Sequence, residues 1–197
     1  MKKQSILLSL FLFTCLQVYS QSGQPKGLMV NDKAPDFSAK DQSGKEISLG
    51  NELKKNKVLL VFYRGEWCPY CNKELKALED SIQLIKAKGV AVIAVSPERA
   101  ENISKTIAKT KASYSILHDE GLAIMKRYDV SFTVDSLTVT KYKAAGIDFN
   151  AANGSGNGTN LPVPAIYIIG KDQKITYRYF NADYRRRPTV KELLSKL

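Results

Sequence analysis

Two continuous apolar runs, separated by a helix-length segment, restrict the folds available to this chain more than any other feature of the sequence. The runs are Val58–Tyr63 and Val90–Val95, and each has the character of a strand buried on both faces. Between them, leucines and isoleucines recur every three or four residues from Asn72 to Lys88, which predicts a helix that ends at Gly89. A strand, a helix and a second strand in this order pair in parallel, so we predict an α/β fold.

The other predicted elements extend this unit into a mixed central sheet flanked by helices. Two antiparallel strands, Ala165–Ile169 and Lys174–Phe180, are expected around the turn Gly170–Gln173. Further short strands are predicted at Phe37–Ala39 and Ile47–Leu49, and helices at Gly121–Tyr128 and Pro188–Leu197. One more helix is predicted to start at Ser96–Glu98, with Pro97 in its first turn.

The segment Thr133–Pro162 interrupts this order of strands and helices. Its first half predicts a weak helix around Leu137–Ala145. Its second half contains the glycine-rich stretch Asn153–Gly158, which lacks the lysine of a phosphate-binding loop and does not join a strand to a helix. We therefore predict a flexible surface loop in this stretch.

The N-terminus has the pattern of a secretory signal peptide. Lys2 and Lys3 precede the short apolar stretch Ile6–Leu16, and Val18-Tyr19-Ser20 suits cleavage after Ser20. We therefore predict a signal peptide over residues 1–20, a lead segment over residues 21–33 and one domain over residues 34–197, exported to the periplasm. The alternative is that the apolar stretch stays in place as an uncleaved membrane anchor.

The chain is basic, but its charge does not predict a nucleic-acid partner. It has 30 Lys and Arg residues against 19 Asp and Glu residues, a net charge of +11. The basic residues are scattered and only Arg185–Arg187 forms a run, whereas a nucleic-acid-binding face gathers them in a patch or stripe. We expect neither a nucleic-acid partner nor a specific membrane partner.

The predicted mature chain keeps two cysteines, Cys68 and Cys71. A disulfide between them would close a loop too small to restrict the unfolded chain much, so we expect the pair to react rather than to cross-link. A structural zinc ion needs four ligands, and the chain has no second cysteine pair and only one histidine, His118. We therefore predict no metal site and no cofactor, and a structural role for His118.

The segment Arg64–Cys71 is the part of the sequence that carries chemistry. A strand ends before it and a helix starts at about Cys71, so both sulfurs are expected at a helix N-terminus, where unpaired backbone N–H groups favour a thiolate. Pro69 stiffens the turn between the two cysteines. Trp67 is a candidate wall beside the sulfurs and Arg64 a candidate partner of the thiolate, with local packing and a solvated loop charge as the alternatives.

These residues resemble those of two related groups of proteins. The strand, the segment Trp67–Cys71 and the helix resemble the thioredoxin fold. The wider pattern, from about Leu28 to the C-terminus, resembles the peroxiredoxin family of the alkyl hydroperoxide reductase and thiol-specific antioxidant type. The motifs that carry this resemblance are Ala34–Phe37, Val95–Glu98, Leu117–Gly121, Leu161–Ala165, Asp183–Tyr184 and Arg186–Arg187. The resemblance implies a thioredoxin-like α/β fold and thiol redox chemistry.

The chain departs from the peroxiredoxin pattern at the site itself. Laid over that pattern, Arg64 stands at the position of a proline, Cys68 at that of a threonine, and Cys71 at that of the cysteine that attacks peroxide. The family's later arginine would fall near Pro164, so its contact to the peroxide is missing unless Arg64 replaces it. Pro164 instead matches the cis-proline that faces the cysteine pair in thioredoxins, which implies a cis bond between Val163 and Pro164.

Three functions follow from these patterns. The first is a thioredoxin-dependent peroxidase, in which Cys71 attacks a hydroperoxide, Cys68 resolves the sulfenic acid, and a thioredoxin-like thiol donor restores the pair. The second is an exported thiol–disulfide oxidoreductase that exchanges the pair with disulfides of other proteins. The third is a non-catalytic binding module with the same fold, and the intact cysteine pair argues against it.

Overall fold

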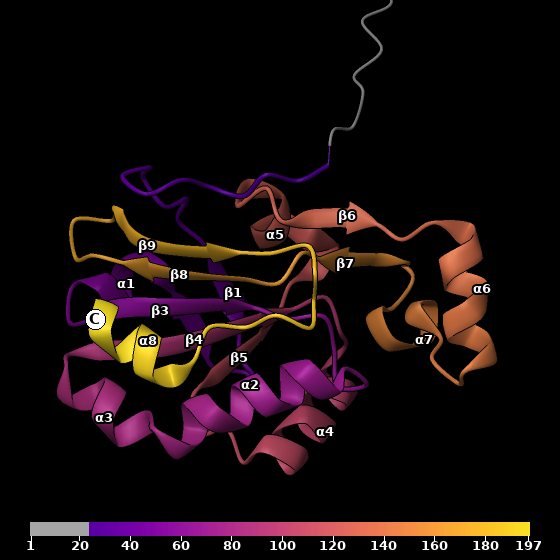
Figure 1. Ribbon diagram of the computed structural model, residues 1–197, viewed down its shortest axis with the longest axis horizontal. Helices are drawn as coiled ribbons and strands as arrows, with labels where there is room; N and C mark the ends of the chain where they lie inside the picture. The colour runs from indigo at the N-terminus through magenta and orange to yellow at the C-terminus, as the bar shows by residue number, and fades with distance from the viewer. Residues whose placement is uncertain (1–23) are drawn as a thin grey trace, which may run out of the picture.

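A five-stranded sheet forms the centre of the computed structural model, which describes residues 24–197 (Figure 1). The predicted signal peptide, residues 1–20, lies outside the described residues, as do residues 21–23 of the predicted lead segment. The strand order is β5-β4-β3-β8-β9. The strands are β3 (Lys57–Phe62), β4 (Val90–Ser96), β5 (Ser115–His118), β8 (Ala165–Ile169) and β9 (Ile175–Phe180). The β3–β4 and β4–β5 pairs are parallel and the β3–β8 and β8–β9 pairs antiparallel, which confirms the predicted mixed sheet.

Helices cover both faces of this sheet, because side chains alternate between the faces along each strand. One face packs on α2 (Pro69–Asp80), α3 (Ile82–Ala87), α4 (Ala100–Thr110) and α8 (Val190–Lys196) (Figure 1). The other face packs on α1 (Leu49–Leu53), the 3-10 turn η1 (Glu120–Leu122) and α5 (Ala123–Arg127). A small hairpin, β1 (Ser38–Lys40) with β2 (Glu46–Ser48), forms a separate ladder beside β5, to which Asp41 is bridged at Leu117. None of the helices within residues 24–197 has both the length and the apolar character that crossing a membrane requires.

Two predicted helices start or end at other residues than expected. The helix predicted over Asn72–Lys88 is two helices, α2 and α3, because the backbone of Ser81 leaves the helical range at φ −111° and ψ 9°. The helix predicted from Ser96–Glu98 starts at Ala100 instead. Its expected first turn is a loop. Ser96 Oγ accepts a hydrogen bond from the Glu98 backbone, and the Glu98 side chain turns inward to the loop between β3 and α2.

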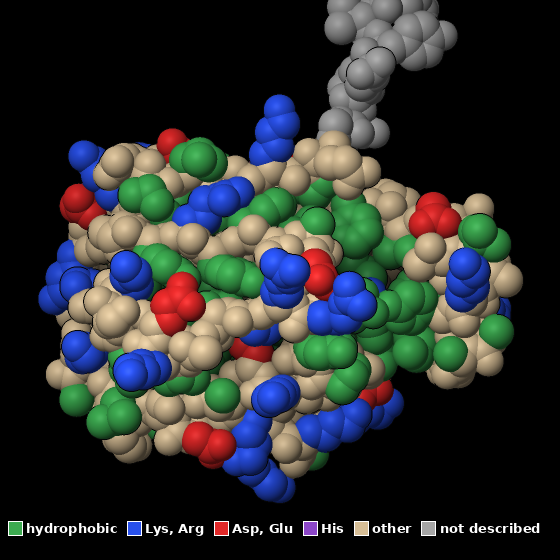
Figure 2. Space-filling model, in the orientation of Figure 1, with side chains coloured by type: hydrophobic (Ala, Val, Ile, Leu, Met, Phe, Trp, Pro, Cys, Tyr) green, Lys and Arg blue, Asp and Glu red, His purple; other side chains and the backbone are tan. Residues whose placement is uncertain are grey.

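A lobe of residues 131–162 projects from the body of the domain, and we call it the β6–β7 lobe (Figure 1). It consists of β6 (Ser131–Thr133), α6 (Ser136–Ala144), α7 (Phe149–Asn153) and β7 (Asn160–Pro162). Strands β6 and β7 pair as an antiparallel ladder at its base, and α6 corresponds to the helix predicted around Leu137–Ala145. Helix α6 buries none of its residues. Figure 2 shows apolar side chains gathered where the lobe meets the body, and basic side chains scattered over the same view.

The glycine-rich stretch of the lobe is a loop with Ser155 and Gly156 exposed, as predicted, but two of its asparagines are buried. Asn157 is only 2% exposed, and its Nδ2 donates hydrogen bonds to the Pro97 carbonyl at 2.7 Å and the Asp119 carbonyl at 3.0 Å. Asn153 likewise donates to the carbonyls of Gly158 and Asn160. The amide of Asn153 thus bonds carbonyls within the lobe, and that of Asn157 fastens the lobe to the loops after β4 and β5, contacts that the glycine-rich composition does not predict.

The described part of the predicted lead segment is hydrogen-bonded to the domain. The Asn31 backbone N–H donates to the Ile175 carbonyl at 2.9 Å, and the Ile175 N–H donates in turn to the Asp32 carbonyl at 3.0 Å. Leu28 donates to the hydroxyl of Tyr167 at 3.1 Å. Gly27 has a positive φ of 66°, and a Cβ atom there would lie 2.5 Å from the same hydroxyl, so only glycine fits.

Asn157→Ala should destabilise the protein by about 2 kcal/mol, because it leaves two buried carbonyl groups without their donor. Urea unfolding followed by circular dichroism measures this change. Asn150→Ala is the matched control, because Asn150 is exposed in the same lobe, and it should cost less than about 0.5 kcal/mol. Equal stability of the two variants would show that the Asn157 bonds do not support the lobe.

Candidate active site

The two cysteines lie at the N-terminus of α2, directly after the end of β3. Cys68 is the N-cap residue, Pro69 occupies the first turn, and the Cys68 sulfur accepts a hydrogen bond from the Cys71 backbone at 3.4 Å. Proline suits this position because its fixed φ is helical and the missing N–H would have no partner there. Both sulfurs are free thiols, buried to within 1% of full burial and 2.6 Å apart. Only a small displacement separates them from the bond length of a disulfide.

The charge of the pair is unevenly divided. The Cys71 thiol donates to the Cys68 sulfur, and this hydrogen bond, assisted by the charges of Arg64 and Arg187, lowers the pKa of Cys68 to about 7. Burial raises the pKa of Cys71 well above its ordinary value, and the bond to Cys68 adds to that rise. In the reduced protein these effects favour the thiolate on Cys68 and the proton on Cys71.

Arg64 is a buried residue of the loop between β3 and α2, so it is not the solvated loop charge that was the alternative for it. Its side chain is 6% exposed, and Nη2 donates to the Tyr142 hydroxyl at 2.8 Å. Its guanidinium lies 4.8 Å from the ring centroid of Trp67 and 4.1 Å from that of Tyr184. Aromatic faces attract a guanidinium by their negative quadrupole, which compensates part of the cost of its burial.

Trp67 joins the active-site loop to the β6–β7 lobe. Its ring lies 5.4 Å from that of Tyr142 and 5.3 Å from that of Phe149, and it also packs on the core cluster that contains both cysteines. Local packing is therefore one role of Trp67, and the cluster on which it packs contains both cysteines.

Arg187 is a candidate site residue whose place the sequence did not predict. Its Nη2 lies 3.6 Å from the Cys71 sulfur, and its Nε donates to Glu74 Oε2 at 3.0 Å. Both partners of this ion pair are nearly buried, with side chains 11% and 5% exposed. Arg187 follows Cys71 by 116 positions, so no local spacing connects them. The only sequence signal was the basic run Arg185–Arg187 and its part in the family resemblance.

Glu98 is bonded to the active-site loop, residues 63–68 between β3 and α2. It is fully buried, its Oε2 accepts a hydrogen bond from the Glu66 backbone at 2.8 Å, and burial raises its pKa to about 8. Gly65 is necessary above it, because a Cβ atom there would lie 2.6 Å from Glu98 Oε1 and 2.5 Å from Trp67 Nε1. His118 Nδ1 donates a hydrogen bond to the Glu98 carbonyl at 2.7 Å, a contact typical of a structural histidine.

Pro164 lies near the site, but its peptide bond is not the predicted cis bond. The Val163–Pro164 bond is trans, like every other described peptide bond. Two hydrogen bonds keep the chain extended from β7 into β8: Val163 donates to the Val130 carbonyl at 2.8 Å, and Asn181 donates to the Pro164 carbonyl at 3.3 Å. Pro164 and Arg64 both line a cleft of about 110 Å³, so the structure does bring these two predicted residues together.

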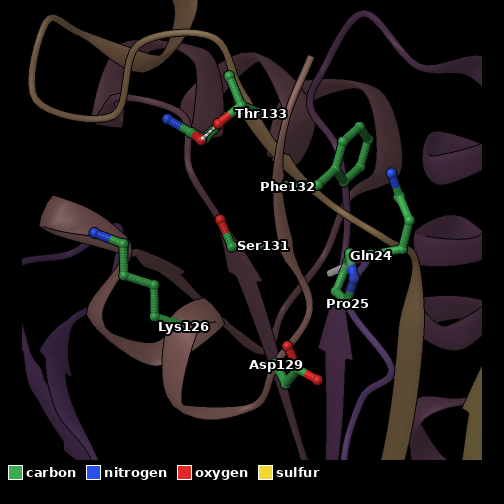
Figure 3. Close-up of a pocket in the computed structure, with 8 residues that line it drawn as sticks. Gln24, Pro25, Lys126, Asp129, Ser131, Phe132 and Thr133 are labelled. Carbon is green, nitrogen blue, oxygen red and sulfur yellow. Dashed lines mark hydrogen bonds between the residues drawn. The ribbon is translucent and has the colours of Figure 1, made fainter. Parts of the chain in front are cut away.

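A larger cavity lies away from the cysteines, at the start of the β6–β7 lobe (Figure 3). Its volume is about 380 Å³, and its lining includes Lys126, Asp129 and Phe132. Neither cysteine and neither active-site arginine lines it. Phe132 also lines the small cleft at Arg64, so the two hollows meet at that ring.

Comparison with known proteins gives a consistent family and fold. The AhpC/TSA family is matched over residues 30–178. Chloroplastic peroxiredoxin Q of Arabidopsis thaliana is 37% identical over 97 residues, which are 49% of this chain and 44% of that protein. Peroxiredoxin Bcp of Escherichia coli K12 is 29% identical over 103 residues, 52% of this chain and 65% of that protein. The chain thus spans about half the length of the curated relatives that it matches.

Solved structures with the same fold include proteins of both redox classes that the sequence suggests. Peroxidoxin BcpB from Mycobacterium tuberculosis superposes with a TM-score of 0.64 at 18% identity, covering 85% of this chain and 94% of that one. A putative protein disulfide isomerase from Bacteroides thetaiotaomicron superposes with a TM-score of 0.59 at 18% identity, covering 86% and 87%. At these identities the likeness confirms the thioredoxin-like fold only.

The reduced protein should titrate a thiolate with a midpoint near pH 7, and the step should belong to Cys68. Below that pH the Cys68 thiol is protonated and alkylation by iodoacetamide slows; above it the thiolate absorbs in the ultraviolet and reacts. Cys71→Ala should raise the midpoint, because it removes the thiol that donates to Cys68. A step that survives unchanged in Cys68→Ala, or a midpoint near that of an ordinary thiol, would contradict this distribution of charge.

Proposed function

The chain belongs to the AhpC/TSA family, and from that premise we propose that it is a thiol peroxidase that reduces hydroperoxides through Cys68 and Cys71. The observation that carries the proposal is the pair itself: two free sulfurs 2.6 Å apart at a helix N-terminus, with Arg187 3.6 Å from the Cys71 sulfur and the buried Arg64 in the same loop. The names of the curated relatives, peroxiredoxin Q and peroxiredoxin Bcp, support the same activity.

The reaction takes two electrons from the thiol pair. One thiolate sulfur attacks a peroxide oxygen, the O–O bond breaks, and the alcohol or water leaves with a proton, so the sulfur becomes a sulfenic acid. The second sulfur then attacks the first, the S–O bond breaks, water leaves, and a disulfide forms. A thiol donor of the thioredoxin type returns the two electrons and restores both thiols.

We assign the first attack to Cys68 and the resolving step to Cys71. The family resemblance implies the reverse order, but it rests on sequence position, whereas the attacking species must be the thiolate. The hydrogen bond from Cys71 and the charge of Arg64 favour the thiolate on Cys68, whereas Arg187 lowers the pKa of both thiols. The Cys71 thiol is already in place to resolve the sulfenic acid.

The neighbouring residues have distinct parts in this proposal. Arg64 and Arg187 stabilise the thiolate and the negative charge that develops on the leaving oxygen. Pro69 fixes the turn that holds the sulfurs together, and Trp67 and Pro164 exclude water beside Arg64.

Disulfide exchange with exported proteins is the second candidate, and one observation favours it. A cysteine at the N-cap with a pKa of about 7, followed two positions later by Tyr70, 40% exposed, also suits attack on a protein disulfide. The two functions need the same thiolate and differ in the oxidant that it meets.

Purified protein should consume hydrogen peroxide in stopped-flow measurements, and the two cysteine variants should differ. Cys68→Ser should slow consumption by at least about 100-fold, because the remaining thiol stays protonated at neutral pH. Cys71→Ser should still react once and leave a sulfenic acid on Cys68 that a dimedone reagent traps.

Three other outcomes would change the assignment. Trapping on Cys71 of the Cys68→Ser protein, with full peroxide reactivity, would restore the order that the family resemblance implies. No peroxide consumption by the wild type, with mixed disulfides collecting on Cys68 of the Cys71→Ser protein, would indicate disulfide exchange. Neither reaction in either variant would leave only a binding module.

We further propose that the protein is exported to the periplasm and loses residues 1–20. The support is the pattern of Lys2, Lys3 and the apolar stretch Ile6–Leu16. N-terminal sequencing of protein recovered from the periplasm should start at Gln21. Recovery of a chain that starts at Met1 from the membrane fraction would indicate an anchor instead.

A further inference from the structure

The β6–β7 lobe packs on the active-site loop, in addition to the bonds by which Asn157 fastens it to the loops after β4 and β5. Its apolar cluster, Val134, Phe149 and Leu161, packs against Trp67 of that loop. Tyr142 of α6 meets the Trp67 ring edge-on at 5.4 Å and lies 5.0 Å from the Phe149 ring. The ring of Tyr142 is therefore fixed on both sides, and its hydroxyl has a defined position.

That hydroxyl is the hydrogen-bond acceptor of Arg64. Arg64 Nη2 donates to it at 2.8 Å, and the other close neighbours of the guanidinium are the faces of the Trp67, Tyr142 and Tyr184 rings. Within residues 24–197 no carboxylate forms an ion pair with Arg64. A ring face attracts a guanidinium over a broad range of positions, whereas a hydrogen bond fixes its distance and direction.

We propose that Tyr142 is a positioning residue of the active site, whose hydroxyl holds the Arg64 guanidinium where its charge stabilises the Cys68 thiolate. The inference rests on the thiol chemistry proposed above, and it makes the β6–β7 lobe a part of the site. Three groups lower the pKa of Cys68: the Cys71 thiol 2.6 Å away, Arg64 of the same loop, and Arg187, whose Nη2 lies 3.6 Å from the Cys71 sulfur. Loss of the hydroxyl frees only Arg64 and leaves the other two in place.

Tyr142→Phe tests this directly, because it keeps the ring between Trp67 and Phe149 and removes only the hydroxyl. The pKa of Cys68, followed by thiolate absorbance and by the pH dependence of alkylation, should rise by about 0.5 unit or more, since a fixed cation within a few ångströms favours the thiolate. Alkylation at a pH below both midpoints should slow by about threefold. Tyr177→Phe is the matched control. It removes the hydroxyl of a β9 residue, which donates to Glu192 of α8 at 2.8 Å, and it should leave the pKa of Cys68 unchanged.

A double variant separates positioning from a general structural effect. If Tyr142 acts through Arg64, then Tyr142→Phe should add no further shift in an Arg64→Gln background. The proposal is overturned if Tyr142→Phe leaves the pKa of Cys68 where it is, or if it shifts that pKa equally with and without Arg64. Because the readout is a pKa and not turnover, failure to consume peroxide would overturn the proposed function without touching this result.

Discussion

The hydrogen bond from the Cys71 thiol to the Cys68 sulfur is the interaction on which the chemistry of this protein depends. It lowers the pKa of Cys68 to about 7, and it adds to the burial that raises the pKa of Cys71 well above its ordinary value. The bond exists because Cys68 caps α2 and Pro69 starts its first turn, which places the side chain of Cys71 back against the cap. Local helix geometry thus supplies both a reactive thiolate and a protonated partner.

The rest of the fold keeps that short turn in place. Strand β3 is central in the sheet, so the loop that leaves it has little freedom at its first residue. Glu98, just after the neighbouring strand β4, accepts a hydrogen bond from the Glu66 backbone. The loop can come this close to the carboxyl group because Gly65 has no Cβ atom. Glu74, one turn farther along α2 than Cys71, holds Arg187 beside the sulfur. Each of these contacts joins segments that are distant in sequence.

That distance decides how much of the molecule could be predicted from the sequence. The apolar runs of β3 and β4 and the cysteine pair at a helix start are local patterns, and they predicted the mixed α/β sheet and the candidate site. Arg187 and Tyr142 could not be found in the same way, because Arg187 reaches the Cys71 sulfur from the C-terminal segment and Tyr142 reaches Arg64 from the β6–β7 lobe. The buried amide of Asn157 was hidden in a glycine-rich composition that usually indicates a mobile loop. The cis bond at Pro164 was wrong because it was carried over from the thioredoxin pattern, whereas here two backbone hydrogen bonds hold an extended chain.

The two buried arginines act on only one redox state of the pair. A thiolate on Cys68 carries charge and a disulfide carries none, so every contact that lowers the pKa of Cys68 stabilises the reduced state relative to the oxidised one. A stabilised reduced state makes the disulfide easier to reduce by an external thiol. Among residues 24–197 no carboxylate forms an ion pair with Arg64, so in the oxidised state the faces of the Trp67, Tyr142 and Tyr184 rings compensate part of the cost of its burial. The same charges therefore serve both halves of a thiol cycle: they provide the thiolate that attacks and they favour the return of electrons to the pair.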